Sequence, residues 1–83
     1  MICVDSSALV AIVKGEPDRD RFIAAISDAG QSWLSAANYV EASMVCEGGE
    51  KAPGKALFES EFQLLATLGL AIVAFDEIQA ELA

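Results

Sequence analysis

The sequence predicts an α/β domain in which a parallel sheet lies between layers of helices. Residues 2–4, 32–35 and 70–75 are short enough to be strands, and the first and last of these runs are apolar throughout. Segments typical of helices separate them, in the order strand, two helices, strand, two helices, strand, helix. Buried strands that alternate with helices indicate a parallel sheet with helices on both faces.

The first two helices have clear boundary signals. Asp5, Ser6 and Ser7 can each cap an apolar helix over residues 8–13, and Gly15 is suited to end it. A second helix restarts at Pro17, since proline is tolerated in a first turn, and it ends at Gly30. Its apolar residues recur at spacings of three and four and therefore share one face: Phe22, Ile23, Ile26 and Ala29.

The remaining elements are strongly apolar. The helix over residues 36–47 is apolar almost all round, which predicts burial on most sides. A glycine-rich loop over residues 48–54 precedes a helix over residues 55–68, and Gly69 ends that helix. The strand over residues 70–75 has no polar side chain, so we expect it to be buried on both faces.

The last residues contain the beginning of a further helix. Asp76 can cap it, with Gln79 at the spacing of a capping box, and Ile78 and Leu82 form its first apolar pair. A helix that stops at Ala83 is too short to be stable by itself. We therefore expect residues 1–83 to be a single domain that is incomplete on its C-terminal side. The alternative is a small natural domain whose last helix packs early.

Composition excludes several kinds of site. The chain has 83 residues, no histidine and two cysteines, so a Ser-His-Asp triad, a Cys-His pair and a four-ligand zinc site are excluded. Any metal would be held by carboxylates, which favours Mg²⁺ or Mn²⁺. Cys3 and Cys46 lie in apolar runs and are expected to be reduced thiols in the core.

Charge and hydropathy limit the partners and the location. Thirteen acidic and five basic residues give a net charge of −8, which argues against simple nucleic-acid binding but not against a metal-dependent nuclease. No signal peptide is visible, and no apolar run reaches the roughly 20 residues that span a bilayer. We expect a cytoplasmic protein without a membrane segment.

Two carboxylates are candidates for a functional site. Asp5 follows the first strand, and ligands bind beyond the carboxyl ends of parallel strands, although Asp5 could also be only a helix cap. Glu41 is the only charged residue in the middle of the most apolar helix, where a metal ion would offset its burial, although it could also lie on an exposed stripe with Asn38. If the sheet brings the two elements together, Asp5 and Glu41 form half of an oxygen-ligand metal site.

The chain resembles the PIN-domain ribonuclease toxins of the VapC type over essentially all of its length. The similar segments are Met1-Ile-Cys-Val-Asp-Ser-Ser-Ala-Leu-Val-Ala-Ile, Gly15-Glu-Pro, Leu34-Ser-Ala-Ala-Asn-Tyr-Val-Glu-Ala and the last eleven residues. The resemblance implies a PIN-like three-layer αβα fold and hydrolysis of RNA by Mg²⁺ or Mn²⁺ held on acidic residues. Asp5 and Glu41 would be catalytic metal ligands.

The resemblance also implies neighbouring groups and partners. A Ser6 hydroxyl is expected near the metal. From the residues themselves, either Ser6 or Ser7 could add a hydroxyl or a hydrogen bond beside the metal ligands, and Asn38 is a further candidate for that role. A cognate antitoxin and a homodimer are implied. The family's later aspartates have no counterpart in these 83 residues, so we expect weak metal binding and little activity from the chain alone.

Two other functions stay open. One is a non-catalytic α/β fragment, or a fold that serves as an assembly partner, with Asp5 only a cap. The other is a different metal-dependent phosphohydrolase, which the absence of an Asp-x-Asp motif at Asp5 disfavours.

Overall fold

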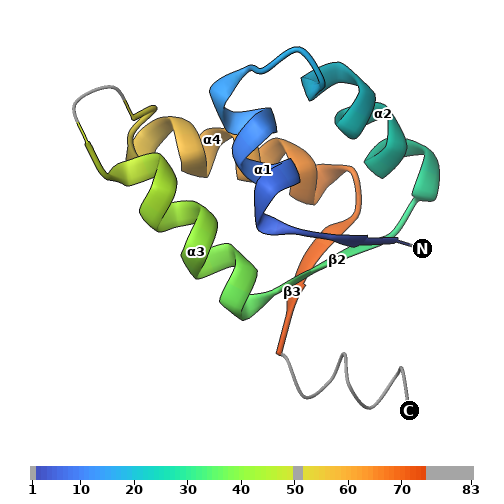
Figure 1. Cartoon of the computed structure of the whole chain (residues 1–83). Coiled ribbons are helices and arrows are strands. Elements are labelled where there is room, and N and C mark those ends of the chain that lie inside the picture. Colours follow the sequence, from blue (N-terminus) through green and yellow to red (C-terminus); the bar gives the residue numbers. More distant parts are fainter. Residues whose placement is uncertain (1, 50–51, 75–83) are drawn as a thin grey trace.

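A computed structural model describes residues 2–49 and 52–74. The described elements are β1 (Ile2–Val4), α1 (Ser6–Lys14), α2 (Arg19–Ala29), β2 (Ser32–Ser35), α3 (Ala36–Glu47), α4 (Lys55–Thr67) and β3 (Leu70–Val73) (Figure 1). This order of strands and helices is the predicted one. The expected fifth helix, with its cap at Asp76, lies outside the described residues.

The three strands form a parallel sheet in the order β1-β2-β3. The register pairs Val4 with Leu34 and Leu34 with Ile72. Both crossovers run in the same direction across the sheet, and right-handed crossovers of that kind place their helices on the same face. Accordingly, α1, α2 and α4 lie on one side of the sheet (Figure 1). The predicted α/β class with a parallel sheet is confirmed.

The core lies between that face of the sheet and the helices. The fully buried side chains Leu9, Ile12, Ile26, Leu34, Phe58 and Leu65 come from α1, α2, β2 and α4. Tyr39 of α3 packs edge-on against Phe58 and Phe62 of α4, with ring centroids 5.3 and 5.1 Å apart. These contacts fix α3 beside α4 and α1.

The opposite face of the sheet corrects two predictions. Its register partners Cys3, Trp33 and Ala71 are exposed, half-buried and exposed, respectively. The strand β3 is therefore not buried on both faces, and Cys3 is not a core thiol, whereas Cys46 is buried as expected. The reason is that the described helices cover the other face. Among residues 2–49 and 52–74, no second layer of helices covers the Cys3 side.

The helix α3 corrects a third prediction. Only Ala42 and Cys46 are buried, whereas Val40 and Met44 are 54% and 68% exposed. An apolar sequence with no polar side does not show which side will pack, and the structure packs one side only.

A glycine shapes the turn between α1 and α2. Gly15 ends α1 in the left-handed conformation, with φ 69°, and its N–H reaches the carbonyl oxygens of Ala11 and Ile12. That conformation strains residues with a Cβ atom, so glycine is favoured here. Arg19 then fastens the start of α2, because its guanidinium donates to both carboxylate oxygens of Glu61, at 3.1 and 3.0 Å, and to the Ile12 carbonyl.

Within residues 2–49 and 52–74, the helices are too short or too polar to cross a membrane.

Candidate metal-binding site

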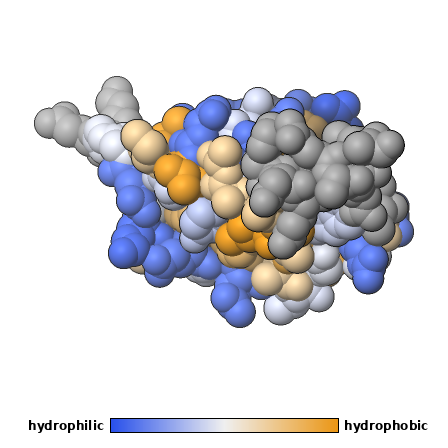
Figure 2. Space-filling model, turned by 90° about the horizontal axis from the view of Figure 1, so that it is seen from below, coloured by the Kyte–Doolittle hydropathy of each residue, from blue (hydrophilic) through white to orange (hydrophobic). Residues whose placement is uncertain are grey.

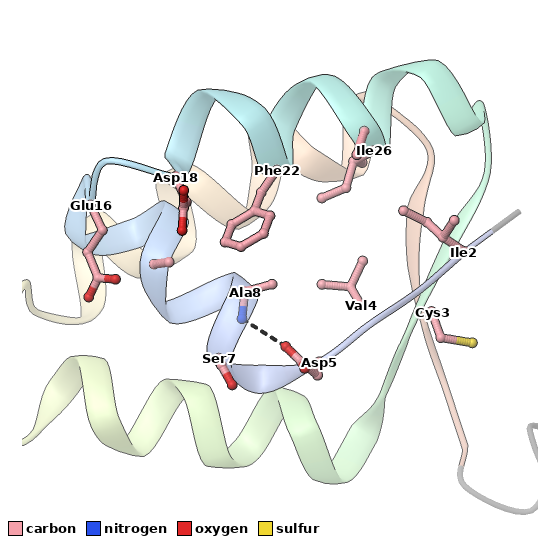
Figure 3. Close-up of a pocket in the computed structure, with 12 residues that line it drawn as sticks. Ile2, Cys3, Val4, Asp5, Ser7, Ala8, Glu16, Asp18, Phe22 and Ile26 are labelled. Atoms are coloured by element: carbon pink, nitrogen blue, oxygen red, sulfur yellow. Dashed lines mark hydrogen bonds between the residues drawn. The ribbon is translucent and has the colours of Figure 1, made fainter.

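Asp5 lies at the point where β1 ends and α1 begins. Its backbone is extended, and its Oδ1 accepts a hydrogen bond from the Ala8 N–H at 2.9 Å (Figure 3). Asp5 is therefore the N-cap of α1, while Ser6 and Ser7 lie inside the helix. The cap uses one carboxylate oxygen; none of the described residues hydrogen-bonds to Oδ2. The Asp5 side chain is exposed, so a cation could reach this second oxygen.

Glu41 is tied to the beginning of α1. The Ser6 hydroxyl donates to Glu41 Oε1 at 2.8 Å, across 35 positions of the sequence. Because Ser6 directly follows Asp5, this bond places Glu41 beside the residue next to the cap. Glu41 is exposed, so the prediction that it is buried in an apolar helix is wrong, whereas Asn38, which was expected to share an exposed stripe with it, is partly buried.

The parallel sheet explains why Ser6 and Glu41 meet. The strands β1 and β2 are neighbours, and each leads directly into a helix, α1 or α3. Ser35 caps α3, since its Oγ accepts from the Asn38 N–H at 3.0 Å. Both helices therefore start at the carboxyl edge of the sheet and lie side by side (Figure 1). Asn38 is partly buried, and its side chain makes no hydrogen bond with the described residues.

Two depressions border these residues. One, of about 310 Å³, lies between α1 and α3 and is lined by Ser6, Ser7, Val10, Glu16, Glu41 and Val45. The other, of about 460 Å³, lies between β1, α1 and α2, with Asp5, Glu16 and Asp18 among its lining residues. Figure 3 shows Val4, Phe22 and Ile26 around its apolar interior, with Asp5 at its edge. Ser7 lines both depressions, and its role beside the carboxylates stays a prediction.

Glu16 and Asp18 are acidic neighbours of the site that the sequence did not single out. Glu16 lines both depressions, and its N–H is held by the Ala11 carbonyl at 3.0 Å. Asp18 forms an ion pair with Arg21, with 3.3 Å between Oδ1 of Asp18 and Nη2 of Arg21. Their only signal in the sequence is the Gly15 turn, which ends α1 so that Glu16 and Asp18 lie beside the depression that α1 and α2 border. Among the described residues, no lysine or arginine lines either depression. The charged side chains that line the two depressions are therefore all acidic.

The donor set suits a hard cation only in part. Carboxylate oxygens are the ligands that Mg²⁺ and Mn²⁺ prefer. Asp5 and Glu41 supply two such groups, and Ser6 orients one of them. Within the part of the chain that is described, no three Asp, Glu, His or Cys side chains gather closely enough to hold a metal. Asp5 and Glu41 therefore suit such a cation by their chemistry, but the described residues do not complete a site for it.

Comparison with known proteins identifies the family of the chain. The family described as PIN domain matches residues 2–83. The chain is 37% identical over 81 residues to Ribonuclease VapC of Mycolicibacterium smegmatis, a match that covers 96% of this chain and 60% of that protein. It is 41% identical over 51 residues to Ribonuclease VapC30 of Mycobacterium tuberculosis, which covers 61% of this chain and 39% of that protein. The matches thus span 60% and 39% of the lengths of these two relatives. The match along nearly the whole chain shows that it belongs to the PIN-domain family.

Proposed function

We propose that this chain carries part of the active site of a metal-dependent endoribonuclease, a toxin of a type II toxin–antitoxin system. The observation that supports this most directly is the hydrogen bond from Ser6 to Glu41, because it ties the second candidate carboxylate to the residue that follows Asp5. The relatives that match the chain are named ribonucleases.

Each side chain has a distinct part in the proposed site. Asp5 is held in place by its bond to the Ala8 N–H and offers Oδ2 to a cation. Glu41 offers its carboxylate from α3, and Ser6 fixes the orientation of that carboxylate. Mg²⁺ or Mn²⁺, when bound, would activate a water for attack on phosphorus and stabilise the leaving oxygen. The absence of histidine is compatible with this chemistry, since no imidazole base is needed.

The same geometry sets the expected strength of the site. Two carboxylates give a cation only part of the six oxygen ligands that Mg²⁺ requires. We therefore propose that the 83-residue chain holds Mg²⁺ or Mn²⁺ weakly and cleaves RNA little by itself.

The proposed partners are an RNA substrate and a basic antitoxin. The depressions beside Asp5 and Glu41 are lined by acidic groups, and the chain has a net charge of −8. An arginine or lysine of the antitoxin would pair with these carboxylates and block access to the metal. Binding of this kind should weaken with salt and on removal of the Glu41 charge.

The test is a chimera in which this chain replaces the matching part of the M. smegmatis ribonuclease. Cleavage of a fluorogenic RNA with Mg²⁺ or Mn²⁺ is measured for the chimera and for Asp5→Asn and Glu41→Gln. Asparagine is as good a cap as aspartate, and glutamine can still accept from Ser6, so both variants remove charge but keep the local structure. We expect a loss of cleavage of about 100-fold or more.

Matched variants separate the site from general charge effects. Asp28→Asn changes an exposed aspartate of α2 that lines neither depression, and Glu47→Gln changes another exposed glutamate of α3. Both should leave cleavage nearly unchanged. A folded chimera that is inactive, or that keeps its activity in Asp5→Asn, would favour the alternative in which Asp5 is only a helix cap. Strong cleavage by the 83-residue chain alone would contradict the proposal that its site is insufficient.

A further inference from the structure

The larger of the two depressions, between β1, α1 and α2, has an apolar interior. The buried side chains of its lining are Val4, Ala11 and Ile26, and Phe22 beside them is half-buried. Figure 3 shows Phe22 and Ile26 of α2 and Val4 of β1 directed into the same space. Its volume of about 460 Å³ is one in which proteins commonly bind small organic molecules.

The charged side chains that line this depression are carboxylates, and two of them lack a partner among the described residues. Asp18 is paired with Arg21. Asp5 uses Oδ1 for the Ala8 N–H, which leaves Oδ2 without a hydrogen bond. The Glu16 side chain forms no hydrogen bond or ion pair within residues 2–49 and 52–74, although its backbone N–H and carbonyl are both bonded. Asp5 and Glu16 are exposed, so a dissolved cation can reach them.

The combination of an enclosed apolar interior and unpaired carboxylates defines the ligand. Apolar surface alone does not, because apolar patches bordered by hydrophilic surface also occur on the side that Figure 2 shows. A neutral apolar molecule would leave the carboxylates unpaired, and an anion would be repelled by them. A small inorganic cation would gain nothing from Val4, Phe22 and Ile26. The lining therefore fits a molecule with an apolar body and a positive charge at one end.

We infer that the larger depression binds an organic ammonium ion, a primary amine with an aromatic body. The body would pack on Val4, Phe22 and Ile26, and the ammonium group would donate a charge-assisted hydrogen bond to Asp5 Oδ2. The smaller depression does not suit such a ligand, because its lining has no aromatic side chain. Since Asp5 is exposed, solvent screens the ion pair, and we expect binding in the millimolar range.

The use of Asp5 Oδ2 gives this ligand a consequence for the candidate metal site. The ammonium group and a metal ion would take the same oxygen, so each should weaken the binding of the other. This consequence rests on the proposed function, whereas binding of the amine does not.

The experiment titrates the 83-residue chain with phenethylammonium, without added metal, and follows the amide signals by nuclear magnetic resonance. We expect saturable shifts at the residues that line the larger depression. Three probes serve as matched controls. Phenethyl alcohol has the same shape without the charge, methylammonium has the charge without the aromatic body, and hydrocinnamate reverses the charge. Each should bind about tenfold more weakly or not at all.

Variants locate the two ends of the ligand. Asp5→Asn keeps the cap but removes the charge and should weaken binding about tenfold, whereas Asp28→Asn, which lies outside the lining, should bind as the wild type does. Ala25 is exposed and lines the depression, so Ala25→Leu should fill it and weaken binding by a similar factor. Ala24→Leu is the matched control, because Ala24 is also exposed but lies outside the lining. Leucine suits a helix, so both variants should keep the helical circular dichroism.

Several results would overturn the inference. These are the absence of saturable shifts in the lining, equal affinities for the amine and any of the three control probes, and unchanged affinity in Asp5→Asn or Ala25→Leu. A separate titration adds Mn²⁺ to the chain saturated with amine. Binding of both ligands without competition would contradict the metal role of Asp5 and leave the amine site standing, so failure of the nuclease proposal would be seen separately.

Discussion

The inner and outer sides of α3 have similar sequences but different environments. The inner side presents Ala42 and Cys46, which are fully buried, while the outer side presents Ala37, Val40 and Met44, which are exposed. Both sides are apolar, so hydrophobicity alone does not orient the helix. What orients it is the fit of small inner side chains against α1, together with the packing of Tyr39 on Phe58 and Phe62. In a helix that is apolar on both sides, an apolar residue therefore does not by itself predict burial. The elements that pack against the helix must also be known.

The largest effect expected from this difference is on stability. Ala42→Asp would bury an unpaired carboxylate and should lower the free energy of unfolding by roughly 3 kcal/mol or more. Ala37→Asp places the same group on the outer side and should cost well under about 1 kcal/mol, chiefly through helix propensity. Urea unfolding followed by circular dichroism measures both. Equal losses for the two variants would show that α3 is not oriented as described.

A second variant tests the contact between α1 and α3 at the candidate site. Ser6→Ala removes the donor to Glu41 Oε1 and should weaken Mn²⁺ binding about tenfold, because Glu41 loses its fixed orientation. Since the bond is exposed, stability should fall by less than about 1 kcal/mol. Ser43→Ala is the matched control, because the Ser43 hydroxyl donates only to the Val40 carbonyl of its own helix. Manganese titration by electron paramagnetic resonance compares the two. Unchanged affinity in Ser6→Ala would remove Ser6 from the site.

The smallest effect expected is on thiol reactivity. Burial raises the pKa of the Cys46 thiol, Lys14 opposes this shift and Glu47 adds to it, so the reactive thiolate is disfavoured in the folded chain. Cys3 is exposed on the uncovered face of the sheet. A thiol reagent at neutral pH should therefore modify Cys3 quickly and Cys46 only on unfolding. Since the folded pKa of Cys46 is raised, its contribution to stability is present below the ordinary thiol pKa and is lost as the pH rises above it. Equal reaction rates for both thiols in the native state would show that the inner side of α3 opens readily.

Part of the site was predictable because local chemistry determines it. The change from apolar residues at 2–4 to Asp5-Ser6-Ser7 marks a strand that ends in a helix cap, and Ser35 before Asn38 does the same for the next helix. Parallel strands then imply that the two helices begin at the same edge of the sheet. The contact between Ser6 and Glu41 follows from that topology, although its partner atoms do not.

By itself, the sequence determined the order of the described elements and the parallel sheet, since these depend on periodicity, caps and turn residues. Its resemblance to known proteins indicated the family, and Asp5 and Glu41 stay candidates for the site. Only the tertiary structure decided which apolar surfaces are covered. It buried Cys46 and exposed Cys3, packed one side of α3, left the Cys3 face of the sheet exposed in the described chain, and placed Glu16 over both depressions. The physical reason is that burial depends on which neighbours a surface meets. A strand or helix that is apolar on every side can pack in several orientations, and its own sequence does not distinguish among them.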